Sequence, residues 1–281
     1  MRWPGAALWR SGGRAACATD PGGRAEQQDR AACFASRDGS CHLLVVADGM
    51  GGHDDGARAA RLVTETAEQL WRGLALPPSA PAEFLETLCQ QAHEAIRRVG
   101  RENGSTPHST VVALLATPLR AWWVHVGDSR LYGFRDGATV CRTEDHSWVW
   151  QLFRSGQIAE AEIGTHPARN RLLRGLGMEE ALHTTHGQMR MSPHTGFVLC
   201  TDGFWAGVSS AEMAELLRGD DPAAACAHWT GVAAQRGGET GDNLAVAVLR
   251  PAGAAPLRHR QLWPLYGALG VALLVLAAWA A

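Results

Sequence analysis

The chain has 281 residues, of which 46% are hydrophobic and 19% are charged, and its formal net charge is −2. These values fit a globular protein with a full core, and they leave no basic surplus that would favour nucleic acid as a partner. The 26 lysine and arginine residues are all arginine, which excludes P-loop, kinase and Schiff-base chemistry that depends on lysine. The 7 cysteines form no CxxC pair, so we interpret them as reduced thiols.

The predicted elements come in groups of one kind. In chain order, the apolar spacing predicts a strand at 43–47, helices at 56–74 and 82–99, strands at 110–116, 121–126 and 130–134, a short helix at 147–155, a strand at 196–200, helices at 211–217 and 221–236, and a strand at 243–249. Asp136-Gly137 is a predicted hairpin turn. Grouped strands and paired helices favour an α+β fold with antiparallel sheet over an alternating parallel fold.

The last part of the sequence is uncharged. Roughly 20 residues, at about 1.5 Å each, cover the 30 Å or so of a bilayer's hydrocarbon layer. Arg258 and Arg260 precede this segment, as in a cytoplasmic basic flank. A buried core helix is the alternative, but the segment has no polar face. We expect a globular domain at 1–250 in the cytoplasm, a linker at 251–261 and a single-pass transmembrane helix at 262–281, in the inner membrane.

Carboxylates beside turn-forming residues recur along the chain. Asp48 and Asp202 each precede a glycine, and Asp242 precedes Asn243. Glycine lets a backbone carbonyl approach a cation closely, and hard oxygen ligands select Mg²⁺ or Mn²⁺ over zinc. Because a single Asp-Gly pair is usually only a turn, the metal hypothesis depends on the residues around these aspartates.

Those flanking residues form ordered motifs. They are Thr19-Asp20-Pro21-Gly22 followed by Arg24 to Asp29, Val45 to His53, Val126-Gly127-Asp128-Ser129-Arg130, His166 to Arg174, Leu199 to Gly203, and Gly241 to Val246. In order and spacing they resemble the PPM family of metal-dependent serine/threonine phosphatases, the PP2C-like group, in its bacterial form. The resemblance runs over residues 7–250, nearly the whole part before the apolar segment.

The resemblance implies an antiparallel β-sandwich flanked by paired helices, with metal ions in a cleft at one end. It implies two Mn²⁺ or Mg²⁺ ions, with Asp48 bridging both and the carbonyl of Gly49 on one of them. Asp202 and Asp242 would complete the shell of the other ion. Asp145, together with Asp202, would hold a third and weaker ion.

The resemblance also implies the substrate and its contacts. Arg24 would clamp the substrate phosphate with its planar guanidinium, and Asp29 would bind or orient a water of the metal shell. The implied partners are phosphorylated proteins and a cognate serine/threonine kinase, besides the membrane. A rival hypothesis is a catalytically weak, membrane-tethered module that binds phosphoproteins without turning them over.

Three positions depart from the family pattern or stay open. Gln28 stands where the family most often has glutamate, so we expect weaker metal binding unless Glu26 compensates. Asp128 lies in a short turn between two predicted strands, so we expect a structural role for it. Met50 stands where some members carry a histidine thought to protonate the leaving group, so the general acid is unassigned.

Overall fold

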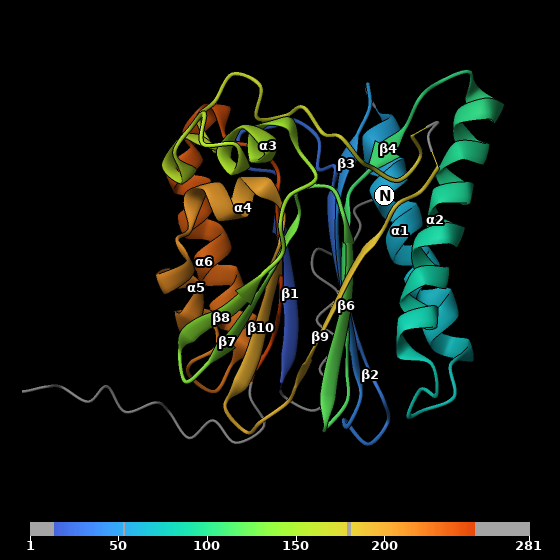
Figure 1. Ribbon diagram of the computed structural model, residues 1–281, viewed down its shortest axis with the longest axis vertical. Coiled ribbons are helices and arrows are strands. Elements are labelled where there is room, and N and C mark those ends of the chain that lie inside the picture. Colours follow the sequence, from blue (N-terminus) through green and yellow to red (C-terminus); the bar gives the residue numbers. More distant parts are fainter. Residues whose placement is uncertain (1–13, 53, 179–180, 251–281) are drawn as a thin grey trace, which may run out of the picture.

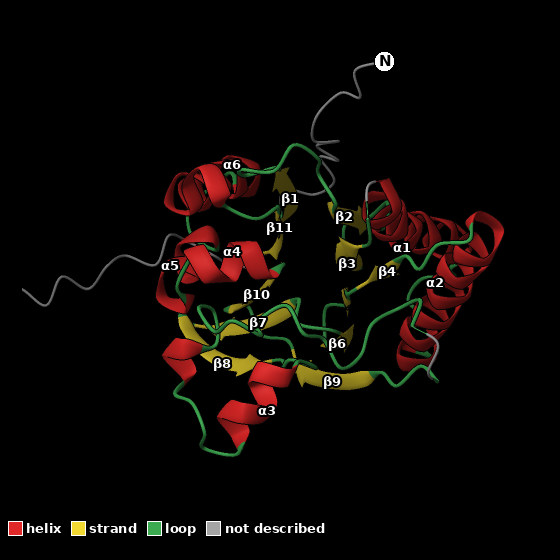
Figure 2. Ribbon diagram, turned by 90° about the horizontal axis from the view of Figure 1, so that it is seen from above, coloured by secondary structure: helices red, strands yellow, loops and turns green. Residues whose placement is uncertain are grey.

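The computed structural model of the protein describes residues 14–52, 54–178 and 181–250. They form two antiparallel sheets packed face to face, with helices on both outer sides (Figures 1 and 2). The predicted α+β sandwich with flanking helices is therefore confirmed. None of the helices in these residues combines the length and apolar character needed to cross a bilayer. The linker and transmembrane helix predicted at 251–261 and 262–281 lie outside the described residues.

The first sheet has the strand order β1-β11-β10-β7-β8. Its strands are β1 (Ala15–Asp20), β7 (Arg130–Arg135), β8 (Ala138–Arg142), β10 (Thr195–Cys200) and β11 (Leu244–Leu249). The central strands β10 and β11 are buried along their whole length, because helices cover one face and the second sheet covers the other. Asp136 and Gly137 both have positive φ, 52° and 80°, which confirms the predicted hairpin turn between β7 and β8.

The second sheet has the strand order β2-β3-β5-β6-β9. Its strands are β2 (Asp29–Ala35), β3 (His42–Met50), β5 (Val111–Ala116), β6 (Arg120–Val126) and β9 (Thr185–Arg190), and the short β4 (His108–Ser109) pairs with the end of β3. The sequence predicted a strand at 43–47, but β3 continues to Met50. The strand is longer than expected because β4 pairs with Gly49 and Met50.

Two sets of helices cover the sheets. The helices α1 (Asp54–Gly73) and α2 (Pro81–Asn103) pack on the second sheet. The helices α4 (Asp202–Gly207), α5 (Ser210–Leu216) and α6 (Pro222–Gly237) lie on the first sheet. α3 (Trp148–Arg154) and the 3-10 turn η1 (Glu160–Glu162) lie in the connection from β8 to β9, and a second 3-10 turn, η2 (Gly238–Thr240), follows α6.

The strand directions bring carboxylates to one end of the sandwich. Asp202 lies two positions after the end of β10, and Asp242 lies two positions before the start of β11. Because β10 and β11 are antiparallel neighbours, the end of one and the start of the other lie at the same edge of the sheet. Buried side chains between the sheets, such as Leu44, Val46 and Leu199, hold this edge against β3, which carries Asp48 near its own end.

Candidate metal centre

One side of the centre is built from paired strands. Asp29 on β2 stands directly opposite Asp48 on β3 in the register, and Asp29 is only 1% exposed. The backbone N–H of Asp48 donates to the hydroxyl of Thr110 at 2.9 Å, and its carbonyl accepts the N–H of Thr110 at 2.8 Å. The backbone of Asp48 is therefore fixed on both sides by hydrogen bonds, which leaves its carboxylate little freedom of position.

Gly49 occupies a position that no other residue fits. A Cβ atom there would lie 1.9 Å from the carbonyl oxygen of Gly56 and 2.8 Å from that of Gln28. A Cβ at Gly56 would in turn lie 2.7 Å from both the Gly49 carbonyl oxygen and the Gln28 side-chain oxygen. Two acceptor oxygens thus converge beside the start of α1, and such oxygens suit a hard cation or its water.

The other side of the centre is built from turns. Asp202 opens α4, and its Oδ1 accepts the N–H of Gly203 at 2.7 Å. Asp242 accepts Nη2 of Arg24 at 3.1 Å, and the side chains of Arg24 and Asp242 are 54% and 34% exposed. These residues line a cleft of about 480 Å³ together with Asp48 and Gly49. Five of the predicted site residues, Arg24, Asp48, Gly49, Asp202 and Asp242, are therefore brought together, and Asp29 lies beside Asp48 on the neighbouring strand.

Asn243 holds the loop that carries Arg24. Its amide donates to the carbonyl oxygens of Pro21 at 2.9 Å and Glu26 at 2.8 Å, and its Oδ1 accepts the N–H of Gln28 at 2.8 Å. Asn243 is 6% exposed. Sequence reasoning treated this residue only as a turn former after Asp242, although its place in the motif was the available signal.

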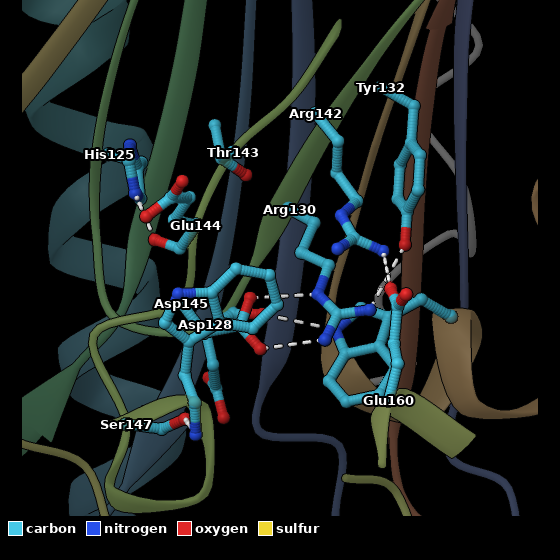
Figure 3. A network of polar contacts seen from close by, with 12 residues as sticks. His125, Asp128, Arg130, Tyr132, Arg142, Thr143, Glu144, Asp145, Ser147 and Glu160 are labelled. Atoms are coloured by element: carbon cyan, nitrogen blue, oxygen red, sulfur yellow. Dashed lines mark hydrogen bonds and ion pairs between the residues drawn. The ribbon is translucent and has the colours of Figure 1, made fainter. Parts of the chain in front are cut away.

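Asp145 does not stand free for a metal. Its two oxygens accept Nε and Nη2 of Arg130 at 2.8 and 2.7 Å, and both side chains are buried (Figure 3). This bidentate ion pair neutralises the carboxylate, and the expectation that Asp145 contacts an ion stays a prediction. Asp128 and Asp145 both line a hollow with Asp202. Asp128 also lines the cleft, and its Oδ1 is buried with no hydrogen-bond partner among the described residues.

Trp205 connects these groups, and nothing in the sequence pattern singled it out. Its indole N–H donates to the carbonyl oxygen of Asp128 at 3.0 Å, and its ring centre lies 3.5 Å from the guanidinium carbon of Arg130. The hydroxyl of Tyr132 accepts Nη1 of Arg130 at 3.2 Å. Arg130 is thus held by a carboxylate, a hydroxyl and an aromatic face, which is how a buried guanidinium is stabilised.

The carboxylates of the centre repel one another. Burial raises the pKa of Asp29, Asp48 and Asp128 well above the usual range, and the negative charge of Asp202 raises each of them further. Burial, followed by the charge of Asp242, raises the pKa of Asp202 to about 6. Among the residues that line the cleft, acidic side chains outnumber the arginine, Arg24, and a bound cation would relieve their repulsion.

This donor set fits a divalent cation. Its oxygens are hard ligands, and two buried oxygens, Oδ2 of Asp29 and Oδ1 of Asp128, have no partner in the described chain. Within residues 14–52, 54–178 and 181–250, no three His, Cys, Asp or Glu side chains already stand close enough to enclose an ion. Residues of the strand side and of the turn side line the same cleft, so a cation bound there would be contacted from both.

A β-sandwich between helix layers, with an oxygen-rich acidic cleft at one end, defines a metal-dependent phosphatase of the kind that the sequence resembles. The family model described as Protein phosphatase 2C matches residues 24–239. The chain belongs to the protein phosphatase 2C family. It is a metal-dependent protein serine/threonine phosphatase, and the rival hypothesis of a binding module without turnover is not favoured.

Known relatives agree with this assignment. The serine/threonine phosphatase stp of Listeria innocua is 31% identical over 206 residues, which are 69% of this chain and 79% of that protein. The crystal structure of the Mycobacterium tuberculosis serine/threonine phosphatase PstP/Ppp has 28% identity and a TM-score of 0.73, covering 85% of this chain and 98% of that one. The catalytic domain of PstP in complex with 2 manganese ions has 28% identity and a TM-score of 0.71, covering 84% and 96%.

Proposed function

We propose that the chain hydrolyses phosphoserine and phosphothreonine esters with two divalent ions, Mn²⁺ or Mg²⁺, held between the strand side and the turn side of the cleft. Asp48 would hold both ions, the Gly49 carbonyl would hold one of them, and Asp202 and Asp242 would hold the other. When bound, the ions lower the pKa of a water and neutralise the phosphoryl oxygens. The observation that carries this proposal is that carboxylates from both sides, Asp48 on the strand side and Asp202 and Asp242 on the turn side, line one cleft.

Asp128 is our candidate for a third, weaker ion, with Asp202. The resemblance assigned that role to Asp145, whose oxygens are both bonded to Arg130. Asp128 has a buried oxygen that no described residue contacts by a hydrogen bond, and the charge of Asp202 acts on it more strongly than that of any other residue. The Asp128 main chain is held by Trp205, so its carboxylate has a defined position from which to bind.

Arg24 and Asp29 act on the substrate and on water. Arg24 stands at the mouth of the cleft, where its guanidinium is half-exposed and its ion pair with Asp242 keeps it directed inward. It donates a fork of hydrogen bonds to the substrate phosphate. Asp29, buried beside Asp48, accepts a hydrogen bond from a water and so orients it.

The test is the Asp48→Asn variant of the full-length protein. We expect Mn²⁺-dependent hydrolysis of p-nitrophenyl phosphate to fall by far more than tenfold, since tenfold corresponds to only about 1.4 kcal/mol of barrier. Asp38→Asn, at the exposed end of the β2–β3 hairpin, is the control and should keep full activity. An Asp48→Asn variant that retained more than about a tenth of the wild-type rate would contradict the two-ion assignment.

We further propose that residues 262–281 anchor the enzyme in the inner membrane with its catalytic domain in the cytoplasm, where it opposes a serine/threonine kinase. The support is the uncharged length of this segment and the arginines before it. Full-length protein should pellet with membranes and resist carbonate extraction. Leu273→Arg should move much of it to the soluble fraction, because arginine at the centre of a span costs about 2.5–3.5 kcal/mol. Wild-type protein that is soluble without detergent would refute the anchor.

A further inference from the structure

A second polar hollow, the α1–α2 groove, lies between these two helices and away from the metal centre. Its volume is about 480 Å³. Thr66 and Gln69 line it from α1, and Gln91, Arg97, Arg98 and Arg101 line it from α2. Figure 1 shows the two helices side by side on the outer face of the second sheet, so the hollow faces solvent.

The three arginines of this hollow have no acidic partner among the described residues. Arg97, Arg98 and Arg101 are exposed and form no ion pair within the described parts of the chain. Glu94 also lines the hollow and precedes Arg98 by four positions, the helical spacing and order that favour such a pair. These two described side chains nevertheless do not pair.

The exposed arginines of the neighbouring helix, α1, do have acidic partners. On α1, Arg61 pairs with Glu65 and Arg72 pairs with Glu68, each four positions away. On this helix pair, two exposed arginines are therefore paired, and the three that are not all lie on α2 and line the hollow. The field of the α2 carboxyl terminus accounts for Arg101, which lies in the last turn, but not for Arg97 and Arg98, which lie before it.

The hollow has the chemistry of an anion site. Three guanidinium groups face a single carboxylate, Glu94, which leaves a surplus of positive charge. Guanidinium groups donate paired hydrogen bonds to phosphate, and the amides of Gln69 and Gln91 add neutral donors. Like charges held close together repel one another, and a bound anion removes that cost.

We propose that this groove binds a second phosphorylated segment of the protein substrate while the metal centre hydrolyses the first phosphate. The proposal rests on the protein phosphatase activity of the chain. From Arg101 the chain runs through Gly104 into β4, which pairs with Gly49 and Met50 at the cleft (Figure 1). The end of α2 that carries Arg101 is thus close in sequence to the strand pair at the cleft, and in this proposal one extended peptide reaches both.

The test compares two charge-matched triple variants of the full-length protein. Arg97→Gln, Arg98→Gln and Arg101→Gln remove the groove arginines, and Arg37→Gln, Arg61→Gln and Arg72→Gln remove three exposed arginines elsewhere. The substrates are p-nitrophenyl phosphate, a peptide with one phosphothreonine, and the same peptide with an added phosphoserine about ten residues away, which spans up to about 35 Å when extended.

For the groove variant we expect KM for the doubly phosphorylated peptide to rise about tenfold, since each of three exposed ion pairs contributes a factor of a few. Its kcat on p-nitrophenyl phosphate and its KM for the singly phosphorylated peptide should match those of the wild type. Turnover of p-nitrophenyl phosphate by the wild type monitors the phosphatase activity separately. An unchanged KM for the doubly phosphorylated peptide, or an equal rise in the control variant, would overturn the proposal. So would arginine-dependent binding to phosphatidylglycerol vesicles with no change in KM, which would assign the groove to a lipid surface.

Discussion

The two walls of the catalytic cleft are built in different ways. On one wall, Asp29 and Asp48 are paired across β2 and β3 inside regular structure, where Asp29 is buried and Asp48 is half-buried at the cleft. On the other wall, Asp202, Asp242 and Arg24 lie where strands have ended, and Arg24 is half-exposed. The strand wall is fixed by its ladder, whereas the turn wall depends on a few side chains that tie loops together.

This difference separates two kinds of damage. A substitution in the strand wall removes a charge from a fixed place and should leave the fold intact. A substitution among the tying side chains of the turn wall should displace groups that it never touches, such as the Arg24 guanidinium that Asn243 supports only through the backbone. Single substitutions can therefore tell the two walls apart.

The largest effect on stability should come from Asp145→Asn. The variant leaves the buried guanidinium of Arg130 without its ion pair, which costs about 3–5 kcal/mol. Glu144→Gln is the matched control, because its partner Arg154 is exposed and the change should cost less than about 1 kcal/mol. Urea unfolding of the metal-free proteins measures both.

Asp128→Asn should behave in the opposite way to Asp145→Asn. It removes a buried carboxylate whose Oδ1 has no partner in the described chain, so the metal-free protein should be as stable as the wild type or more stable. Its Mn²⁺ requirement should rise. If Asp128→Asn destabilises the fold and Asp145→Asn instead weakens metal binding, the two aspartates have the reverse of the roles that we propose.

Asn243→Ala should loosen the turn wall. It removes three hydrogen bonds to the loop at 21–28, at a cost of about 1–3 kcal/mol. Because that loop carries Arg24, KM for a phosphopeptide should rise more than kcat falls. Asn103→Ala, exposed at the end of α2, is the control. A fall in kcat alone would show that Asn243 acts on the metal centre and not on phosphate binding.

His42 lies at the opposite end of β3 from Asp48, so its titration reports on the stability of the strand wall without affecting the metal centre. Burial, with the charge of Arg14, lowers the pKa of His42 to about 4. Between about pH 6.5 and pH 4 the unfolded chain binds a proton that the folded chain does not, so stability is lost as the pH falls through this window. The loss from pH 7 to pH 5 is up to about 2 kcal/mol. His42→Gln should remove this part of the pH dependence in urea unfolding, while exposed His194→Gln should not.

Gln28→Glu should have the smallest effect and should be a gain. The side-chain oxygen of Gln28 and the Gly49 carbonyl oxygen both lie beside Gly56. A carboxylate at position 28 therefore adds negative charge at the strand wall of the metal centre. Outer ligands of this kind change metal affinity by about 10–100-fold, so the Mn²⁺ concentration for half-maximal activity should fall by at least about tenfold. An unchanged requirement would show that Glu26 or another group already supplies the charge.

Much of the fold could be predicted from the sequence, with one systematic omission. The central strands and long helices were found within a few residues, as for β5, predicted at 110–116 and observed at Val111–Ala116. Apart from the very short β4, the strands that were missed, β1, β2, β8 and β9, are the edges of the two sheets. Edge strands are only partly buried, and β9 consists largely of exposed polar residues, so their pairing with a neighbour defines them more than their own pattern does.

The candidate site was predictable where a sequence motif coincides with a steric requirement of the backbone, as at Asp48-Gly49, where only glycine fits the second position. It was not predictable where tertiary contacts decide. The sequence alone does not show which of the two aspartates, Asp128 or Asp145, is available to an ion. The difference between them is the ion pair of Asp145 with Arg130, which lies 15 positions away in the chain. Trp205 contacts the main chain of Asp128 across 77 positions, a relation that no local pattern encodes.

The central claim is that the two walls hold the ions jointly, with Asp48 in common. Calorimetric titration of the metal-free full-length protein with Mn²⁺ tests it most directly, because it needs no substrate. The wild type should bind two ions tightly, and Asp48→Asn should lose both sites together, while exposed Asp38→Asn binds as the wild type does. Loss of one ion with the other bound at unchanged affinity, or no loss at all, would contradict the claim.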